Sequence, residues 1–459
     1  MRRLSILGVV LLVLGCSDNA TNDADVLEIT DDADVTEPDA GEPDIEQIED
    51  VAEDTTPSGE DDVSPDADVC APTPSATLCA QAGAECGTIV ADDGCEEEAT
   101  IQCPSCDPPL TCGANGAENR CGVEGWEVSV VDENGDVGRE VSMVLGPDGY
   151  PRVAYQATIG AGSELRFASF DGTDWTTEKL HDAVLAGKHT AIAYDSAGGL
   201  HVAATSFDGA LLHSLDDGQW SSSTISPTAR GRIGLAFNGE SPHVCVHLES
   251  ATLLVHYGLD EESAWASTTV DGSVAAEARY GNYCSIAVSP DGVVHIAYED
   301  NQFRRLKYAR LDGDVWSKDV ADSEDQDFVG TYISLVLDSD GAPHISYRAG
   351  VVGTPSIRLT SWQQGQWQTR IVDADAGSIA NFTSLAVDSS DGLHITYFDV
   401  NGGVLKYAEP SGAGWDVRAV APVGDEVEVH SVIAVDEDGR RHIVFFDGVN
   451  RRLMYMRSL

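Results

Sequence analysis

Four short segments near the C-terminus set the pattern of the whole chain. SLAVD at residues 384–388 is followed by DGLHITY at 391–397, LKYA at 405–408 and GW at 414–415. Each segment is an alternating or apolar run bounded by turn residues, as is typical of a short β-strand. The Asp391-Gly392 pair favours a tight hairpin, because glycine adopts a positive φ without steric cost. The stretch therefore predicts four strands in one repeat.

The same pattern recurs along the chain. Asp-Gly pairs stand between the first and second runs at 148–149, 291–292, 340–341, 391–392 and 438–439. Seven of the eight tryptophans recur at steps of 49, 45, 45, 51, 51 and 48 residues, namely Trp126, Trp175, Trp220, Trp265, Trp316, Trp367 and Trp415. A period near 48 residues with four strands per repeat is the signature of a β-propeller, in which each blade is one twisted sheet.

The ends of the repeat array give the number of blades. The last repeat has runs at 431–435, 442–446 and 453–456, and the chain stops without a tryptophan strand. An unpaired tryptophan strand at 125–132 precedes the first repeat. We expect this strand to complete the last blade, since closure removes free sheet edges. The predicted fold is an all-β, seven-bladed propeller over residues 123–459.

Residues 1–16 differ in kind from the rest of the chain. Two arginines precede an apolar run that ends in Gly15-Cys16. The segment resembles a bacterial lipoprotein signal peptide, and the run is too short to span a bilayer stably. The resemblance implies cleavage before Cys16, lipidation of its thiol and, because Ser17 follows rather than aspartate, anchoring in the outer membrane at the cell surface.

Residues 17–69 form a strongly acidic segment. They contain 21 Asp or Glu and no Lys or Arg, which predicts a disordered linker. The whole chain has 78 acidic and 26 basic residues and a net charge of −52. Removing the 21 linker acids and the two leading arginines leaves −33 for residues 70–459. This charge excludes nucleic acid as a partner and argues strongly against a polyanion in general.

Residues 70–122 are rich in cysteine. An even number of cysteines in an exported chain predicts four disulfides, whose pairing the sequence leaves open among 105 possibilities. The Cys103-Cys106 spacing could indicate a metal or redox site, but the absence of histidine from the segment favours a structural role. The segment resembles small Cys-rich modules of bacterial surface lipoproteins, which implies a spacer or stalk. The eight cysteines are Cys70, Cys79, Cys86, Cys95, Cys103, Cys106, Cys112 and Cys121.

Two further cysteines lie inside the repeats. Cys245 belongs to the second strand of the third repeat and Cys284 to the first strand of the fourth, which are expected neighbours. A disulfide between blades and two buried thiols are equally compatible with this placement.

Histidine begins the second strand in six of the seven repeats. The positions are His201, His243, His295, His344, His394 and His442, with Arg152 in the first repeat. Equivalent positions are spread around the propeller axis, whereas metal ligands must converge on one point. We therefore expect a structural role, with each histidine bonded between blades, rather than a metal ring or a pH sensor.

The turns at 338–341 and 436–439 each place two aspartates beside a glycine, which suggests a calcium site. No glutamate follows at the distance that a calcium loop requires. We expect solvated hairpin turns and no cofactor, with calcium possible but not favoured.

Gly-containing turns precede Trp175 and Trp220. They resemble a degenerate Asp-box of sialidase-like, BNR-type propellers, from which the QQGQW segment at 363–367 departs. The resemblance implies that these tryptophans pack as folding elements rather than bind sugar. Catalytic sialidases also need an arginine triad, a tyrosine nucleophile and an acid aspartate, none of which can be assigned here. We therefore expect a non-catalytic protein.

Propellers resemble one another in binding ligands on the face that carries the loops before each first strand and after each second strand. These loops vary most here, the longest being 271–283 and 320–332. The predicted function is display of a propeller at the cell surface to bind a glycan or a protein. The alternatives are a sialidase-like enzyme, with two carboxylates about 5 to 9 Å apart, and a structural envelope protein. Candidate ligand-binding residues are Arg230, Arg232, Arg279, Tyr280, Tyr283, Asp325, Tyr332 and His430.

Overall fold

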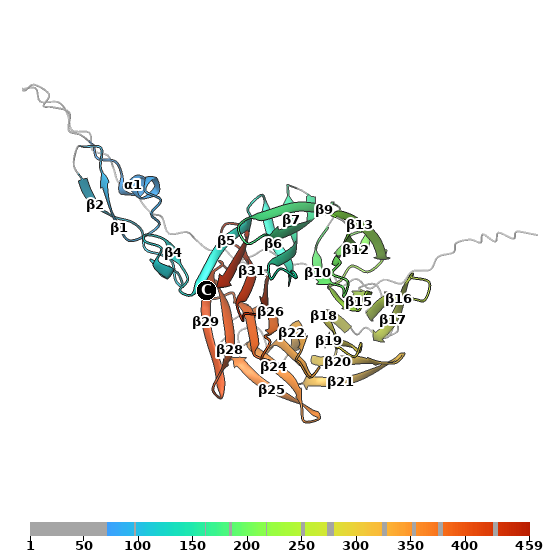
Figure 1. Ribbon diagram of the computed structural model, residues 1–459. Helices are drawn as coiled ribbons and strands as arrows, with labels where there is room; N and C mark the ends of the chain where they lie inside the picture. Colours follow the sequence, from blue (N-terminus) through green and yellow to red (C-terminus); the bar gives the residue numbers. More distant parts are fainter. Residues whose placement is uncertain are drawn as a thin grey trace, which may run out of the picture. The chain divides into compact units, whose positions relative to one another are not determined.

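The computed structural model describes residues 71–459 except 96–97, 161, 183–185, 217, 249–252, 273–279, 324–327, 351–354, 375–379 and 426–429. The predictions for Cys16, for the linker at 17–69 and for Cys70 lie outside the described residues. Seven four-stranded antiparallel sheets, the blades, follow one another around an axis (Figure 1). No described helix is long and apolar enough to cross a membrane.

Blades 1 to 3 each use four consecutive strands. Blade 1 has β6 (Asp136–Leu145), β7 (Pro151–Ile159), β8 (Gly162–Phe170) and β9 (Trp175–Asp182). Blade 2 has β10 (His189–Tyr194), β11 (Leu200–Ser206), β12 (Gly209–Asp216) and β13 (Gln219–Ser226). Blade 3 has β14 (Ile233–Asn238), β15 (Ser241–Leu248), β16 (Leu253–Leu259) and β17 (Trp265–Asp271).

Blades 4 to 6 repeat this order. Blade 4 has β18 (Tyr280–Val288), β19 (Val294–Asp300), β20 (Arg305–Asp312) and β21 (Val315–Ser323). Blade 5 has β22 (Val329–Leu337), β23 (Pro343–Ala349), β24 (Ser356–Gln363) and β25 (Gln366–Asp373). Blade 6 has β26 (Ala380–Val387), β27 (Leu393–Asp399), β28 (Val404–Ser411) and β29 (Gly414–Pro422).

Blade 7 is assembled from both ends of the propeller. It has β30 (Ser431–Val435), β31 (Arg441–Asp447) and β32 (Arg452–Ser458), and β5 (Trp126–Asp132) pairs antiparallel with β32. The pairing runs from Ser458 opposite Trp126 to Leu453 opposite Asp132. The prediction of seven blades closed by an N-terminal strand is therefore confirmed.

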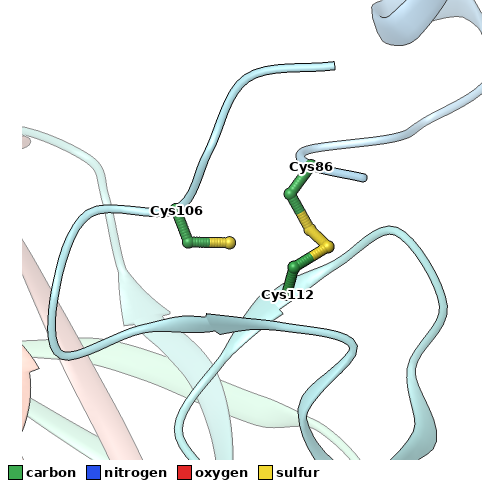
Figure 2. A group of neighbouring side chains, drawn as sticks. All are labelled: Cys86, Cys106 and Cys112. Atoms are coloured by element: carbon green, nitrogen blue, oxygen red, sulfur yellow. A yellow bond between two sulfur atoms is a disulfide. The ribbon is translucent and has the colours of Figure 1, made fainter. Parts of the chain in front are cut away.

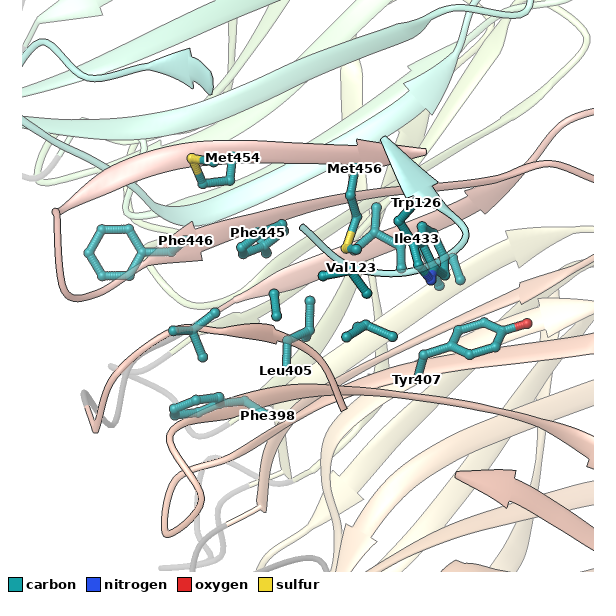
Figure 3. Close-up of a cluster of buried hydrophobic side chains, with 14 of the residues drawn as sticks. Val123, Trp126, Phe398, Leu405, Tyr407, Ile433, Phe445, Phe446, Met454 and Met456 are labelled. Atoms are coloured by element: carbon teal, nitrogen blue, oxygen red, sulfur yellow. The ribbon is translucent and has the colours of Figure 1, made fainter. Parts of the chain in front are cut away.

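The hydrophobic core lies between blades. Figure 3 shows the contact of blades 6 and 7, where Phe398 and Leu405 pack with Phe446, Met456 and Trp126. The second strands are buried on both sides, as in β19, because they face a neighbouring blade on each side. This explains why they are near-continuous apolar runs in the sequence.

Among the described residues, a buried tyrosine, an aspartate and a cation join neighbouring blades at four of the seven contacts. The tyrosine of a second strand donates its hydroxyl hydrogen to the aspartate that ends the fourth strand of the preceding blade, and a Lys or Arg pairs with the same aspartate. The sets are Tyr155, Asp132 and Arg166; Tyr298, Asp271 and Lys307; Tyr347, Asp322 and Arg358; Tyr397, Asp373 and Lys406. Since both ionic partners are largely buried, the hydroxyl bond helps to satisfy the carboxylate.

The repeated tryptophans pack against the preceding blade. Trp175 contacts Tyr455 at 5.3 Å between ring centroids, and Trp367 contacts Tyr308 at 5.0 Å, both edge to face. Their role in packing agrees with the expectation from the sequence.

The Cys-rich module has little regular structure. It contains α1 (Ser75–Gln81), β1 (Thr88–Asp92) paired with β2 (Glu98–Gln102), and β3 (Thr111–Cys112) paired with β4 (Cys121–Gly122), with a 3-10 turn η1 (Ala114–Gly116) between them. All seven described cysteines are disulfide-bonded, including Cys95. The pairs with both partners described are Cys79–Cys103, Cys86–Cys112 and Cys106–Cys121.

The sulfurs of Cys86, Cys106 and Cys112 lie within 4.8 Å of one another (Figure 2). They cannot act as metal ligands while they are in disulfides, because a metal binds the thiolate. Cys103 and Cys106 bond to different partners, so the structural interpretation of this pair is confirmed. Within the propeller, Cys245 of β15 and Cys284 of β18 form a disulfide between blades 3 and 4, which decides between the two alternatives.

Candidate functional site

The first strands of the blades surround the axis, and one side chain per blade gathers where these strands begin. The loops that precede the first strands and follow the second strands lie at this end, which we call the loop face; the opposite end is the hairpin face. The seven side chains, called the axial ring, line a cavity of about 280 Å³. In blade order they are Glu140, His189, Arg232, Tyr283, Tyr332, Phe382 and His430.

Glu140 connects the polar members of the axial ring. Its Oε2 lies 3.3 Å from His189 Nδ1, 3.3 Å from His430 Nε2 and 3.7 Å from Arg232 Nη1. His430 Nδ1 donates to the carbonyl of Arg139, which leaves Nε2 as an acceptor for Arg232 Nη1 at 3.4 Å. Four blades thus meet in one charge-assisted network.

Burial and the network shift the titration of these groups. Burial raises the pKa of Glu140, but the charges of His430, His189 and Arg232 and the bond to His189 outweigh it and lower the pKa to about 2. Burial lowers the pKa of His430 to about 4 and also lowers that of His189, against the opposing effect of Glu140. At neutral pH the axial ring therefore contains a carboxylate, a guanidinium and two neutral imidazoles.

Aromatic side chains complete the axial ring. Tyr283, Tyr332 and Phe382 follow one another with centroid separations of 4.7 and 4.4 Å, and Phe382 reaches His430 at 3.5 Å. The guanidinium carbon of Arg232 lies 4.8 Å from the centroid of Tyr283 and 4.9 Å from that of Phe382. These cation–π contacts hold Arg232 between two rings.

The backbone is irregular at four members of the axial ring. Strand pairing is interrupted between Val137 and Val141, Tyr280 and Cys284, Thr331 and Ser334, and Asn381 and Ser384. Glu140, Tyr283, Tyr332 and Phe382 lie in these four gaps.

Two of these residues also adopt an unfavourable backbone conformation. Tyr332 and Phe382 have φ of 54° and 52°. Irregularities of this kind redirect a side chain, and a bulky residue with positive φ is strained. The backbone of these strands is therefore irregular at the axial ring and regular in the rest of each first strand.

Mostly small residues line the cavity next to the axial ring. Two positions further along the first strands lie Ser142, Ala191, Gly234, Ser285, Ser334, Ser384 and Val432, which also line the cavity. The hydroxyls of Ser285, Ser334 and Ser384 accept hydrogen bonds from backbone N–H groups of the next blade at 3.0 to 3.1 Å. A methyl group at Gly234 would approach Cys245 Sγ and Ile286 Cγ2 to 3.0 Å.

Buried polar groups without partners lie behind the axial ring. In the described part of the chain, Thr205 Oγ1, Glu299 Oε2 and Arg348 Nε have no hydrogen-bond partner. They occupy equivalent positions in the second strands of blades 2, 4 and 5. Burial and the neighbouring Asp300 raise the pKa of Glu299, which is 3% exposed, to about 7. Such groups are uncommon in a folded protein and are concentrated at functional sites.

Half of the predicted ligand-binding residues meet at the axis. Arg232, Tyr283, Tyr332 and His430 line the cavity together. Arg230 does not; it is exposed and stacks on Phe207. Tyr280 begins β18, but its side chain is outside what is described, as are Arg279 and Asp325.

Three members of the axial ring were absent from the predicted residues: His189, and also Glu140 and Phe382. The last two are the most instructive. Neither lies in a long variable loop, so the search for irregular loops passed over both. The repeat itself contained the signal. Glu140 lies three residues before Met143, and Phe382 lies three residues before Leu385. At the same position of their repeats, three residues before an apolar residue of the first strand, lie the predicted Arg232, Tyr283 and Tyr332.

At the hairpin face the histidines of the second strands have a structural role, but within a blade rather than between blades. His442 Nε2 bonds Asp436 of the preceding turn at 3.2 Å, and Nδ1 bonds Tyr455 of the third strand at 2.7 Å. His201, His344 and His394 repeat this arrangement, with serine or tyrosine as the second partner. The expectation of bonds between blades was therefore wrong, because the turn aspartate of the same blade is nearer.

The turns considered for calcium use their aspartates internally. Asp338 Oδ1 accepts the backbone N–H of Asp340 and Ala342, and Oδ2 bonds His344 at 3.0 Å. Asp436 accepts from Arg440 N and bonds His442. These contacts are those of a hairpin turn.

Among the described residues that line the axial cavity, Glu140 is the only carboxylate. Glycoside hydrolysis commonly requires two that flank the scissile bond. The described lining contains no such pair.

No protein-family model matches the chain, and no curated protein sequence matches it. Among solved structures it is similar to an ulvan lyase of a polysaccharide lyase family bound to -[GlcA(1-4)Rha3S]-, with 14% identity and a TM-score of 0.52 over 72% of this chain and 95% of that chain. It is also similar to a variant of the Aleuria aurantia lectin in complex with alpha-methyl-L-fucoside, with 16% identity and a TM-score of 0.44 over 62% and 96%. At these identities the likeness shows the propeller fold alone.

Proposed function

We propose that this propeller binds a carbohydrate at the axial ring. The observation that carries the proposal is the convergence of four strand irregularities and two strained aromatic residues on one cavity. Folding of the repeat does not need them, because blades 2, 3 and 7 form without such an interruption in their first strands. Strain of this kind persists where a side chain must be held in one place for a ligand.

The composition of the axial ring suits a sugar. Arg232 and Tyr283 can donate hydrogen bonds, Glu140 can accept them, and three aromatic rings offer apolar surface beside these groups. A sugar has hydroxyls that both donate and accept and a face of C–H groups that packs on an aromatic ring. The ulvan lyase bound to a saccharide indicates only that a similar fold can accommodate one.

The test is a glycan array probed with the full chain, with and without calcium. We expect selective binding that Glu140→Gln weakens at least about tenfold, or about 1.4 kcal/mol, because the carboxylate positions Arg232 and His189. A matched control is Glu409→Gln on β28. Glu409 accepts from Tyr407 and pairs with Arg441 at 2.7 Å, away from the axial ring.

Binding of the wild type to a peptide library and not to the array would replace the carbohydrate with a protein ligand. Equal losses for Glu140→Gln and Glu409→Gln would show that the axial ring is not the site. Circular dichroism of both variants separates loss of binding from loss of folding.

The same proposal includes display of the propeller at the cell surface. Its support is the lipoprotein-like signal at residues 1–16 and the acidic linker at 17–69. Labelled palmitate should enter the protein through Cys16 and should not enter Cys16→Ala. Unchanged labelling of that variant would refute the anchor while leaving the binding site untouched.

A further inference from the structure

A second feature of the loop face lies outside the axial ring. Three phenylalanines are exposed there by 53%, 53% and 38%, namely Phe207, Phe303 and Phe328. Phe207 and Phe303 stand at the turns after the second strands of blades 2 and 4, and Phe328 immediately precedes β22. All three therefore lie at the loop face, in blades 2, 4 and 5.

Each of these rings is covered by an arginine. The guanidinium carbon of Arg230 lies 4.5 Å from the centroid of Phe207, that of Arg304 lies 4.3 Å from Phe328, and that of Arg305 lies 5.2 Å from Phe303. Stacking of this kind fixes the plane of the guanidinium and leaves its N–H edge free to form hydrogen bonds.

Among the described residues, none of the three arginines has the carboxylate partner that arginine usually has in this protein. The chain has three acidic residues for every basic one, and most described arginines pair with a carboxylate, as Arg441 does with Glu409. Within the described residues, Arg230 and Arg304 form no ion pair within 4.0 Å, although both are exposed. In so acidic a chain, unpaired guanidinium groups on the binding face point to an anion supplied by a ligand.

Arg230 adjoins the axial ring. Only Gly231 separates it from Arg232, so the two Cα atoms are at most about 7 Å apart. A methyl group at Gly231 would come within 2.7 Å of the carbonyl oxygen of His247, which means that this backbone lies flat against β15. From this point Arg232 contacts the rings of the axial ring, and Arg230 contacts Phe207.

We propose that the loop face binds a glycan that carries isolated carboxylates, such as a uronate-containing oligosaccharide. One sugar occupies the axial ring, and the carboxylate of a neighbouring sugar pairs with Arg230 while that sugar packs beside Phe207. Arg304 on Phe328 offers a second position of the same chemistry. This inference rests on the proposed carbohydrate binding and names the class of carbohydrate.

The net charge of the chain still argues against a densely charged polyanion. A single carboxylate is different, because at physiological ionic strength the field of distant acids fades over about 8 Å. At the loop face such a group is influenced mainly by the nearby guanidinium, whose planar edge matches a carboxylate in two parallel hydrogen bonds.

The test compares digalacturonate with its dimethyl ester, and other uronate disaccharides with their esters, by calorimetry on the full chain. We expect the acid to bind at least about tenfold more tightly than the ester, with a preference that falls as salt is raised. Arg230→Gln should remove most of that preference. The matched control is Arg418→Gln, since Arg418 also lies over a ring, Tyr407 at 5.1 Å, but on β29 and paired with Glu409.

Equal binding of acids and esters would overturn this inference and leave carbohydrate binding standing. Retention of the preference in Arg230→Gln, or its loss in Arg418→Gln, would overturn the assignment to Arg230. If no sugar, charged or neutral, binds the wild type, the proposed function fails as well. Melting curves of both variants show whether they fold, which is expected because Arg230 is exposed.

Discussion

The two faces of the propeller are built from the same seven repeats and use them in opposite ways. At the hairpin face one arrangement recurs, in which a histidine joins the aspartate of its turn to the third strand, as His442 joins Asp436 to Tyr455. At the loop face the axial ring takes one residue from the first strand of each blade, and this residue is a glutamate, a histidine, an arginine, a tyrosine or a phenylalanine, depending on the blade. Repeated residues explain folding, whereas residues that depart from the repeat need another explanation.

The faces also differ in how completely their polar groups are bonded. Both ring nitrogens of His201, His344, His394 and His442 have partners. Among the described residues His295 is an exception. Ser289 stands where the other turns have an aspartate, and the Nε2 of His295 has no partner. Behind the axial ring, by contrast, buried polar atoms without a hydrogen-bond partner occur in three blades among the described residues, at Thr205, Glu299 and Arg348. Where the repeat is regular, the polar groups are hydrogen-bonded. At the loop face, where the blades differ, some buried polar groups are not.

The largest effect should come from removing the strand on which both faces depend. Deletion of residues 126–132 removes β5 from blade 7, including the buried side chain of Trp126. We expect a loss of at least about 5 kcal/mol in the free energy of unfolding, because removing one buried tryptophan side chain alone costs about 3 to 5 kcal/mol. Differential scanning calorimetry measures it, and an unchanged melting temperature would refute closure of the ring by β5.

The next prediction separates the two faces. His442→Ala removes a buried imidazole that bonds the half-buried carboxylate of Asp436 and the hydroxyl of buried Tyr455, which should lower the free energy of unfolding by about 2 to 4 kcal/mol. Binding at the loop face should remain as in the wild type at temperatures where the variant is folded. Denaturant titration and calorimetry check both parts, with exposed Ser411→Ala as the control. Lost binding in a folded His442→Ala would mean that the faces are coupled.

A smaller effect concerns the pH dependence of stability. Because burial raises the pKa of Glu299 to about 7, the folded state holds a proton that the unfolded chain releases near pH 4.5. The stabilising contribution is therefore complete below about pH 4.5 and is lost as the pH rises to about 7, amounting to at most about 3 kcal/mol. Glu299→Gln should remove this slope and be the more stable protein at pH 8.

Urea titrations of wild type and Glu299→Gln between pH 4.5 and 8 provide the measurement. His430 and Glu140 contribute in the opposite direction, since their lowered pKa values of about 4 and about 2 cost stability as the pH falls below 6.5 and 4.5. Subtracting the two curves isolates Glu299. Parallel curves would show that this carboxyl ionises as it does in the unfolded chain.

Features that are local or periodic in the sequence were predicted correctly. Strand runs, Asp-Gly hairpins and the orphan tryptophan at 126 were sufficient to predict seven blades and their closure. The cysteine count predicted a disulfide-bonded module, but not its pairing. The histidines of the second strands were correctly judged structural and wrongly judged to bond between blades, because the sequence does not show which aspartate is nearer.

The site was only half predicted. Arg232, Tyr283, Tyr332 and His430 were found because they border variable loops. Glu140 was missed because it lies within a regular-looking strand, and only the interruption of pairing between Val137 and Val141 directs it to the axis. Such an irregularity depends on what the neighbouring blades place there, so it leaves no clear mark on the local pattern.

Taken alone, the sequence determined everything that depends on short-range order: the strands, the turns, the period and hence the number of blades. Only the tertiary structure brought Glu140 to His430, and His430 to the carbonyl of Arg139, 291 residues away in the chain. Strand propensity and turn chemistry act over a few residues and can be read from a segment. The axial ring forms because closure places seven distant strands around one axis, and its charges and strain exist only once that ring is complete.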